Sequence, residues 1–143
     1  MIQYQKILDK NMLNVFKDIL NNIKDNGLSN NNHLYITFLT NHNKVELPNW
    51  LKQKYPEEMT IIIQYEYYDL EINKNNFSIT LSFGDIKTNL KIDYNAIVSF
   101  ADPSANFGLI LQKSKIHKKV NNKLETNISK KDNVINFSNY KKN

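Results

Sequence analysis

The sequence has 143 residues, of which 41% are hydrophobic and 23% charged, a composition that suits one globular domain with a single core. It contains no cysteine, which excludes disulfide bonds, thiolate metal sites and cysteine nucleophiles. Its apolar runs are far shorter than the roughly eighteen residues of a membrane-spanning helix. The N-terminal residues also lack the pattern of a secretory signal, so we expect a cytoplasmic protein without a membrane anchor.

Positive charge is concentrated at the C-terminal end of the chain. All 19 basic residues are lysine, and the formal net charge is +5. Residues 1–112 hold 10 lysines and 12 acidic residues, net −2, whereas residues 113–143 hold 9 lysines and 2 acidic residues, net +7. Without arginine, the chain lacks the bidentate donor that reads guanine and clamps phosphates, and this disfavours a dedicated nucleic-acid surface.

The first predicted element is a helix over residues 4–26. Apolar residues from Tyr4 to Ile23 recur at helical spacing, and Asn26-Gly27 supplies a left-handed stop. These positions cover more than half of the helix circumference, whereas packing on one surface needs a stripe of about 100°. Two interpretations stay open: the helix lies in a broad groove of its own domain, or it also pairs with a second copy, which has a slight advantage.

Short strands follow the helix in close succession. Residues 77–92 alternate between apolar and polar side chains, and Gly84-Asp85 provides the tight turn of a hairpin because Gly84 accepts a positive φ. The run at 59–64 is almost continuously apolar, which predicts a strand covered on both faces. A short helix is expected to start at Pro48. Further strands are predicted at residues 33–38, 67–72, 96–100 and 107–111.

These elements predict an α+β, mostly β fold, in which the N-terminal helix lies beside a small antiparallel barrel or a two-layer sheet. Residues 113–133 are rich in Lys and Asn, cannot bury enough surface to offset their ordering entropy, and are expected to be disordered. An apolar segment with a basic end follows at residues 134–142 and indicates a docking peptide on a flexible tether. The alternative is a C-terminal strand that folds back on the sheet.

The motifs of the common enzyme classes are absent from the sequence. Gly27, Gly84 and Gly108 are too scattered for a phosphate loop, a dinucleotide fingerprint or a nucleophile elbow, and the three histidines show no metal-ligand spacing. Asp69 and Glu71 would share one strand face, but solvated charges on a strand are far more common than a catalytic pair. We therefore predict a protein that is not an enzyme, with no catalytic residue, no metal and no cofactor.

A binding role is favoured instead. A small sheet with a compact hairpin and a segment rich in tyrosine, at Tyr65, Tyr67 and Tyr68, can receive an extended peptide along an edge or groove. Ordinary packing within the sheet is the alternative explanation of the tyrosines.

Three stretches between residues 4 and 112 resemble the stringent starvation protein B (SspB) family in its short-tailed bacterial branch: HLYITF, LPNWLKQKYPEEMTIIIQYEYYDLEI and FSITLSFGDIKTNLKIDYNAIVSFADPSANFGLIL. The terminal NVINFSNYKK is similar to the apolar-then-basic module of that family. The resemblance implies an adaptor of the ClpXP protease with an Sm-like barrel, a homodimer paired through the N-terminal helix, and a groove for the ssrA degradation tag. It also implies a tail that docks on the N-terminal zinc-binding domain of ClpX.

The resemblance divides the chain into three parts. These are a tag-binding domain at residues 1–112 (helix 4–26, barrel 33–112), a flexible linker at 113–133 and a ClpX-docking peptide at 134–143. The implied tag-binding residues are Gln64, Leu81, Ser82, Phe83 and Gly84. The implied docking residues are Val134, Ile135, Phe137, Tyr140, Lys141 and Lys142. The expected dimer interface comprises Leu8, Met12, Val15, Phe16 and Ile19.

Two other functions stay open at this point. An Sm-like RNA- or ribosome-associated binding module would fit a small barrel with a basic tail, and its affinity would fall steeply with salt. A hydrolase that uses Asp69 and Glu71 has little support.

Overall fold

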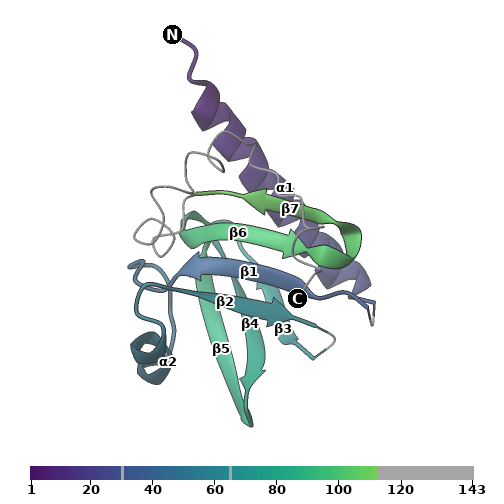
Figure 1. The fold of residues 1–143 in the computed structure, drawn as a ribbon, viewed down its shortest axis with the longest axis vertical. Helices are drawn as coiled ribbons and strands as arrows, with labels where there is room; N and C mark the ends of the chain where they lie inside the picture. The colour runs from purple at the N-terminus through teal and green to yellow at the C-terminus, as the bar shows by residue number, and fades with distance from the viewer. Residues whose placement is uncertain (30, 65, 113–143) are drawn as a thin grey trace, which may run out of the picture.

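The computed structural model of the chain describes residues 1–29, 31–64 and 66–112. These residues form two helices and seven strands, and both helices precede the second strand (Figure 1). Two short 3₁₀ turns, Tyr94–Ala96 and Pro103–Ala105, flank the sixth strand. The helices and strands are α1 (Tyr4–Asn26), β1 (Leu34–Leu39), α2 (Asn49–Lys54), β2 (Glu58–Ile63), β3 (Tyr68–Ile72), β4 (Asn76–Phe83), β5 (Ile86–Asp93), β6 (Ile97–Asp102) and β7 (Phe107–Ile110).

The strands form two antiparallel sheets. One has four strands in the order β2-β1-β6-β7, and the other has three in the order β3-β4-β5. This confirms the mixed α+β, mostly β class that the sequence predicts. In the described part of the chain the sheets do not close into a barrel, so that detail of the prediction is not confirmed.

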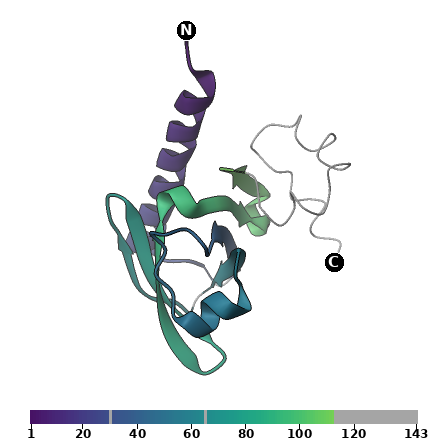
Figure 2. The same ribbon diagram turned by 90° about the vertical axis from the view of Figure 1, so that its left-hand side faces the viewer.

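Helix α1 has the predicted bounds and ends where Gly27 takes a φ of 74°. Its buried residues recur every three or four positions, at Met12, Phe16, Leu20 and Ile23, and so form one stripe against the sheets. The N-terminal half of α1 projects beyond the sheets (Figures 1 and 2). Among the described residues, no helix is both long and apolar enough to span a membrane.

Phe16 is the point where the helix and both sheets meet. Its ring is fully buried and makes edge-to-face contacts with Phe77 of β4 at 5.8 Å and Phe100 of β6 at 5.9 Å, measured between ring centroids. Tyr94, between β5 and β6, lies 6.5 Å from Phe16 and stacks on Phe77 at 6.2 Å. Such aromatic pairs add to the free energy of burial, so this cluster joins α1 to the two sheets.

Strand β2 differs from its prediction. Its side chains alternate between buried and exposed, with Ile61 and Ile63 inside and Thr60 and Ile62 outside. The expectation that both faces are covered is therefore wrong, because Ile62 is 43% exposed. Ile62 lies on the exposed face of β2 and makes the apolar run in the sequence continuous. Its side chain also gives the surface beside this strand an apolar area.

We expect Phe16→Ala to lower the free energy of unfolding by about 3–5 kcal/mol, because it removes a fully buried ring and leaves a cavity where three elements meet. Ile86→Ala is the control: it also truncates a large apolar side chain, but one that is 58% exposed. This control should cost less than about 1 kcal/mol. Urea unfolding followed by circular dichroism measures both values, and equal losses would contradict the central role of Phe16.

Candidate functional site

A groove of about 320 Å³ lies between the two sheets. The end of β2 forms one side, and the end of β4 forms the other. Four of the five residues expected to bind the tag line this groove, although the strands that carry them are far apart in the sequence. The fifth, Gly84, follows directly in the hairpin turn with a φ of 64°. The groove is lined by Thr60, Ile61, Ile62, Gln64, Glu66, Leu81, Ser82 and Phe83.

Strand β2 offers the groove its edge as well as its side chains. It stands at the end of the four-stranded order, so β1 is its one partner strand among the described residues. Consecutive residues 60–62 line the groove, whereas a single face would contribute alternate residues. An edge strand presents backbone N–H and C=O groups in a row, and an extended peptide can pair with them.

The floor of the groove is apolar and its rim is polar. Ile61 and Leu81 are 2% and 5% exposed, while Ser82 and Glu66 stand at the surface. Beside the groove, the hydroxyl group of Thr60 lies 2.7 Å from that of Thr37, its cross-strand partner on β1. This arrangement suits a ligand that buries apolar side chains and keeps a polar main chain near the surface.

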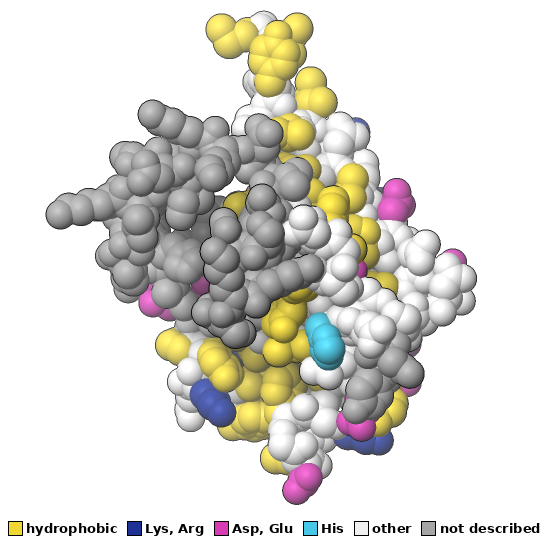
Figure 3. All heavy atoms as spheres, turned by 45° about the vertical axis from the view of Figure 1, so that its right-hand side comes forward, with side chains coloured by type: hydrophobic (Ala, Val, Ile, Leu, Met, Phe, Trp, Pro, Cys, Tyr) yellow, Lys and Arg dark blue, Asp and Glu magenta, His cyan; other side chains and the backbone are white. Residues whose placement is uncertain are grey.

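Aromatic and apolar side chains extend the groove at the hairpin end. Trp50 of α2 packs edge-to-face on Phe83 at 6.2 Å, and Ile86 pairs with Phe83 across the hairpin. Trp50 and Ile86 stay 43% and 58% exposed. Figure 3 shows hydrophobic side chains gathered in a continuous area on this side of the molecule. Exposed apolar area of this kind is typical of an interaction site.

The sequence did not identify Thr60, Ile61, Ile62 and Glu66 as part of this site. Thr60 and Ile62 are two positions apart and share the outward face of β2, and Gln64, directly after the strand, continues this spacing. That period-two signal was present in the sequence, but the continuous apolar run concealed it.

The other side chains considered for chemistry do not gather into a site. Asp69 and Glu71 are both exposed and lie outside the groove, at an irregularity of β3 where Asp69 takes a φ of 53°. His33 is exposed, and Nδ1 of His42 accepts the backbone N–H of Lys44. No group of three or more His, Asp and Glu side chains that could hold a metal ion occurs in residues 1–29, 31–64 and 66–112.

The residues expected at the dimer interface divide into two groups. Phe16 and Met12, at 0% and 6% exposure, are buried within their own chain, and their part in a surface shared with a second copy stays a prediction. Leu8 and Val15 are 47% and 41% exposed, and Ile19 is half-buried.

Several predictions concern residues outside the described part of the chain. They include the linker at residues 113–133 and Tyr65. The six docking residues Val134, Ile135, Phe137, Tyr140, Lys141 and Lys142 also lie there.

Comparison with known proteins adds one finding to this geometry. No curated protein matches the chain. The sequence profile of a family described as Stringent starvation protein B matches residues 6–142, which include both sides of the groove, most of α1 and nearly all of the C-terminal segment. The chain therefore belongs to the stringent starvation protein B family.

Proposed function

We propose that this protein is a proteolysis adaptor, which binds ssrA-tagged polypeptides and tethers them to the ClpXP protease. The observation that carries the proposal is the groove between β2 and β4, in a chain that matches the family along residues 6–142. Four of its lining residues are the ones that the family resemblance assigns to tag binding: Gln64, Leu81, Ser82 and Phe83.

In the proposed complex the tag lies extended along the edge of β2. Its main chain pairs with the open backbone of β2, which supplies affinity that depends little on sequence. Its apolar side chains contact Ile62 and Phe83, while Gln64 and Ser82 donate and accept hydrogen bonds at the rim. The adaptor itself makes and breaks no covalent bond, so recognition of the tag needs a binding groove and no catalytic residue.

Delivery depends on the C-terminal residues in this proposal. Residues 113–133 act as a flexible linker, and residues 134–143 dock on the N-terminal zinc-binding domain of ClpX. A flexible linker of about twenty residues has a root-mean-square span of roughly 25 Å, which gives an effective concentration on the order of millimolar. Two weak contacts then act as one stronger contact, and each is still weak enough to release the substrate.

Pairing through α1 completes the proposed assembly. Tyr4, Leu8 and Val15 fall within a narrow stripe on the helix surface, beside the buried stripe, and are 73%, 47% and 41% exposed. A second copy that packs along this stripe buries them. A homodimer carries two docking tails and so strengthens attachment to the protease.

An Sm-like RNA- or ribosome-associated module is the alternative function. Its support is the basic C-terminal segment, since residues 1–112 carry a net charge of −2. Tight RNA binding by a chain truncated at residue 112, with a steep dependence on salt, would favour this alternative over the adaptor.

The groove is tested by Gln64→Ala and Ser82→Trp. Each should weaken binding of a peptide with the ssrA tag by about tenfold, equivalent to about 1.4 kcal/mol, because the first removes a rim amide and the second fills the groove. Titration followed by the fluorescence anisotropy of a dye-labelled tag peptide measures the affinity, because an introduced tryptophan would add to the emission of Trp50, the single tryptophan of the unaltered chain.

Matched controls lie outside the groove on the same elements or their neighbours. Gln53→Ala on α2 and Ser78→Trp on β4 make the same chemical changes at positions that do not line it. Unaltered affinity in both groove variants, or equal losses in the controls, would place tag binding elsewhere.

Tethering is tested by deletion of residues 134–143. The shortened chain should bind the tag peptide as the full chain does, within about twofold, but should no longer accelerate degradation of a tagged reporter by ClpXP. Degradation rates at reporter concentrations below saturation measure the effect. A truncated protein that delivers substrate as well as the full chain would contradict the tethering mechanism.

The dimer is tested by Leu8→Lys and Val15→Lys. Both positions are exposed in the single chain, so the fold should survive, but an unpaired lysine cannot be buried in an apolar seam. Sedimentation equilibrium should give the mass of a monomer for each variant. Asn14→Lys, on an exposed neighbouring position away from the stripe, should keep the dimer, and dimers in all three variants would exclude this interface.

A further inference from the structure

A second cavity, of about 310 Å³, lies on a different side of α1 from the proposed dimer stripe. Three lysines from three separate segments meet there: Lys17 of α1, Lys44 after β1, and Lys74 in the turn between β3 and β4. Its other polar lining residues are Asn75, Asn95, Tyr94 and one acidic residue, Asp93. Lys17 follows Val15 by two residues, which places it about 160° round the helix from the exposed apolar stripe.

The ammonium group of Lys17 is held in place by groups other than a carboxylate. Its Nζ lies 4.6 Å from the centroid of the Tyr94 ring and donates a hydrogen bond to the carbonyl oxygen of Lys74 at 3.3 Å. Tyr94 is itself fixed, because it is 3% exposed and its hydroxyl donates to the carbonyl oxygen of Asn73 at 2.7 Å. Burial also raises the pKa of Tyr94 to about 12, so its hydroxyl stays neutral.

One carboxylate, Asp93, lines the cavity, and a second, Glu46, lies outside its lining; both have other partners. Asp93, which is 4% exposed, accepts the backbone N–H of Asn95 at 2.8 Å. Glu46 pairs with Lys91 at 4.0 Å. Within the described ranges no ion pair is recorded for Lys17, Lys44 or Lys74, so three lysines share the cavity with a single, buried carboxylate that pairs with none of them, and the lining keeps a positive balance.

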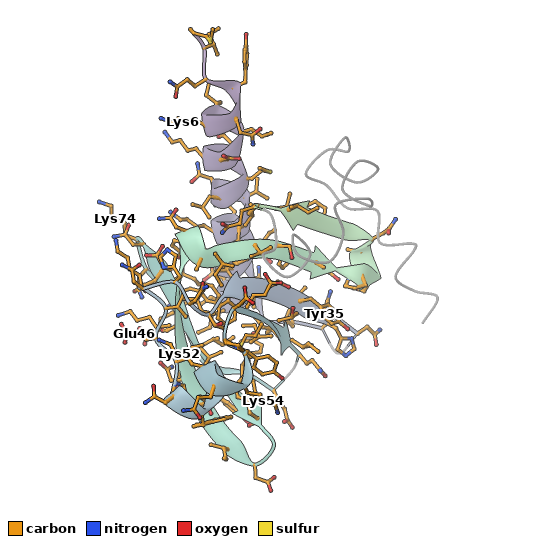
Figure 4. The ribbon with its side chains drawn as sticks, turned by 60° about the vertical axis from the view of Figure 1, so that its left-hand side comes forward. Lys6, Tyr35, Glu46, Lys52, Lys54 and Lys74 are labelled. Atoms are coloured by element: carbon orange, nitrogen blue, oxygen red, sulfur yellow. The ribbon has the colours of Figure 1, made fainter. Side chains whose placement is uncertain are left out.

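We propose that this cavity binds the phosphate groups of a small polyanion, such as a di- or triphosphate. Lysine binds phosphate as a point charge, and the asparagine side-chain amides add neutral donors. Lys44 and Lys74 are exposed and can turn toward a ligand, and Figure 4 shows the side chain of Lys74 at the edge of the body. A long polyanion fits less well, because residues 1–112 carry a net charge of −2 and offer no extended basic track.

A phosphate bound here bridges α1 to the loop after β1 and to the turn before β4. The three ammonium groups come from segments that are far apart in the sequence. A ligand that binds all three therefore acts as a cross-link between the helix and the body. Ligand binding to the folded state alone also raises its stability. The cavity shares no lining residue with the groove, so this inference stands independently of the proposed tag binding.

The site is tested by titrating the full chain with sodium pyrophosphate at physiological salt. Two-dimensional NMR follows the backbone amide resonances during the titration. Saturable shifts are expected at Asn75 and Asn95. The double variant Lys44→Gln/Lys74→Gln should raise the apparent Kd at least about fivefold, because it removes two of three charges. Lys6→Gln/Lys10→Gln, which removes two exposed lysines from the projecting part of α1, should leave the Kd unaltered (Figure 4 labels Lys6).

Three results would overturn the proposal. The first is a set of shifts confined to residues 113–143, which hold nine lysines and attract anions without a cavity. The second is an equal loss in both double variants, which would indicate diffuse charge. The third is tighter binding at Asn75 and Asn95 by a uridine decanucleotide or a tetra-aspartate peptide, which would assign the site to RNA or to an acidic peptide. The same spectra show whether each variant is folded. If the double variant does not fold, the Kd values of the single variants Lys44→Gln and Lys74→Gln test the site.

Discussion

The placement of Phe16 constrains the rest of this structure. One ring touches β4 of the three-stranded sheet and β6 of the four-stranded sheet at nearly equal distances, 5.8 and 5.9 Å. The short helix α2 contributes Leu51 to the core and Trp50 to the hairpin end. Because the groove runs between β2 of one sheet and β4 of the other, its width depends on how the Phe16 ring holds the sheets apart. Core packing and the binding surface are therefore coupled, because Ile61 and Leu81 belong both to the core and to the groove.

The exposed apolar side chains fall into two separate areas, and each has a different physical character. Tyr4, Leu8 and Val15 lie on a regular helix and present an apolar stripe, which suits packing against another helix. Ile62, Trp50 and Ile86 instead surround an edge strand whose backbone is open, which suits an extended chain. An exposed apolar area with an open edge also invites aggregation, so its retention on a small protein is itself an argument for use.

Local signals in the sequence predicted local structure well. The bounds of α1 followed from apolar spacing and from Gly27, and the hairpin followed from strict alternation around Gly84. Strand β2 was assigned correctly but its exposure was not, because a continuous apolar run cannot distinguish a buried face from an apolar binding face. Whether the sheets close into a barrel depends on pairing between segments that are far apart in the sequence, and so does the meeting of Lys17, Lys44 and Lys74. A local sequence pattern does not predict either feature.

Helix α1 unites these surfaces because its 3.6-residue period gives it several faces at once. The stripe through Phe16 and Leu20 fixes the sheets, the stripe through Leu8 and Val15 is open to a partner, and Lys17 lies on the flank away from that partner. A ligand that bridges Lys17 to Lys44 tightens the helix on the body without touching either the open stripe or the groove. Lys17 directly follows Phe16, whose ring touches both sheets, so an effect of this ligand on the proposed tag binding would travel as a change in the spacing of the two sheets.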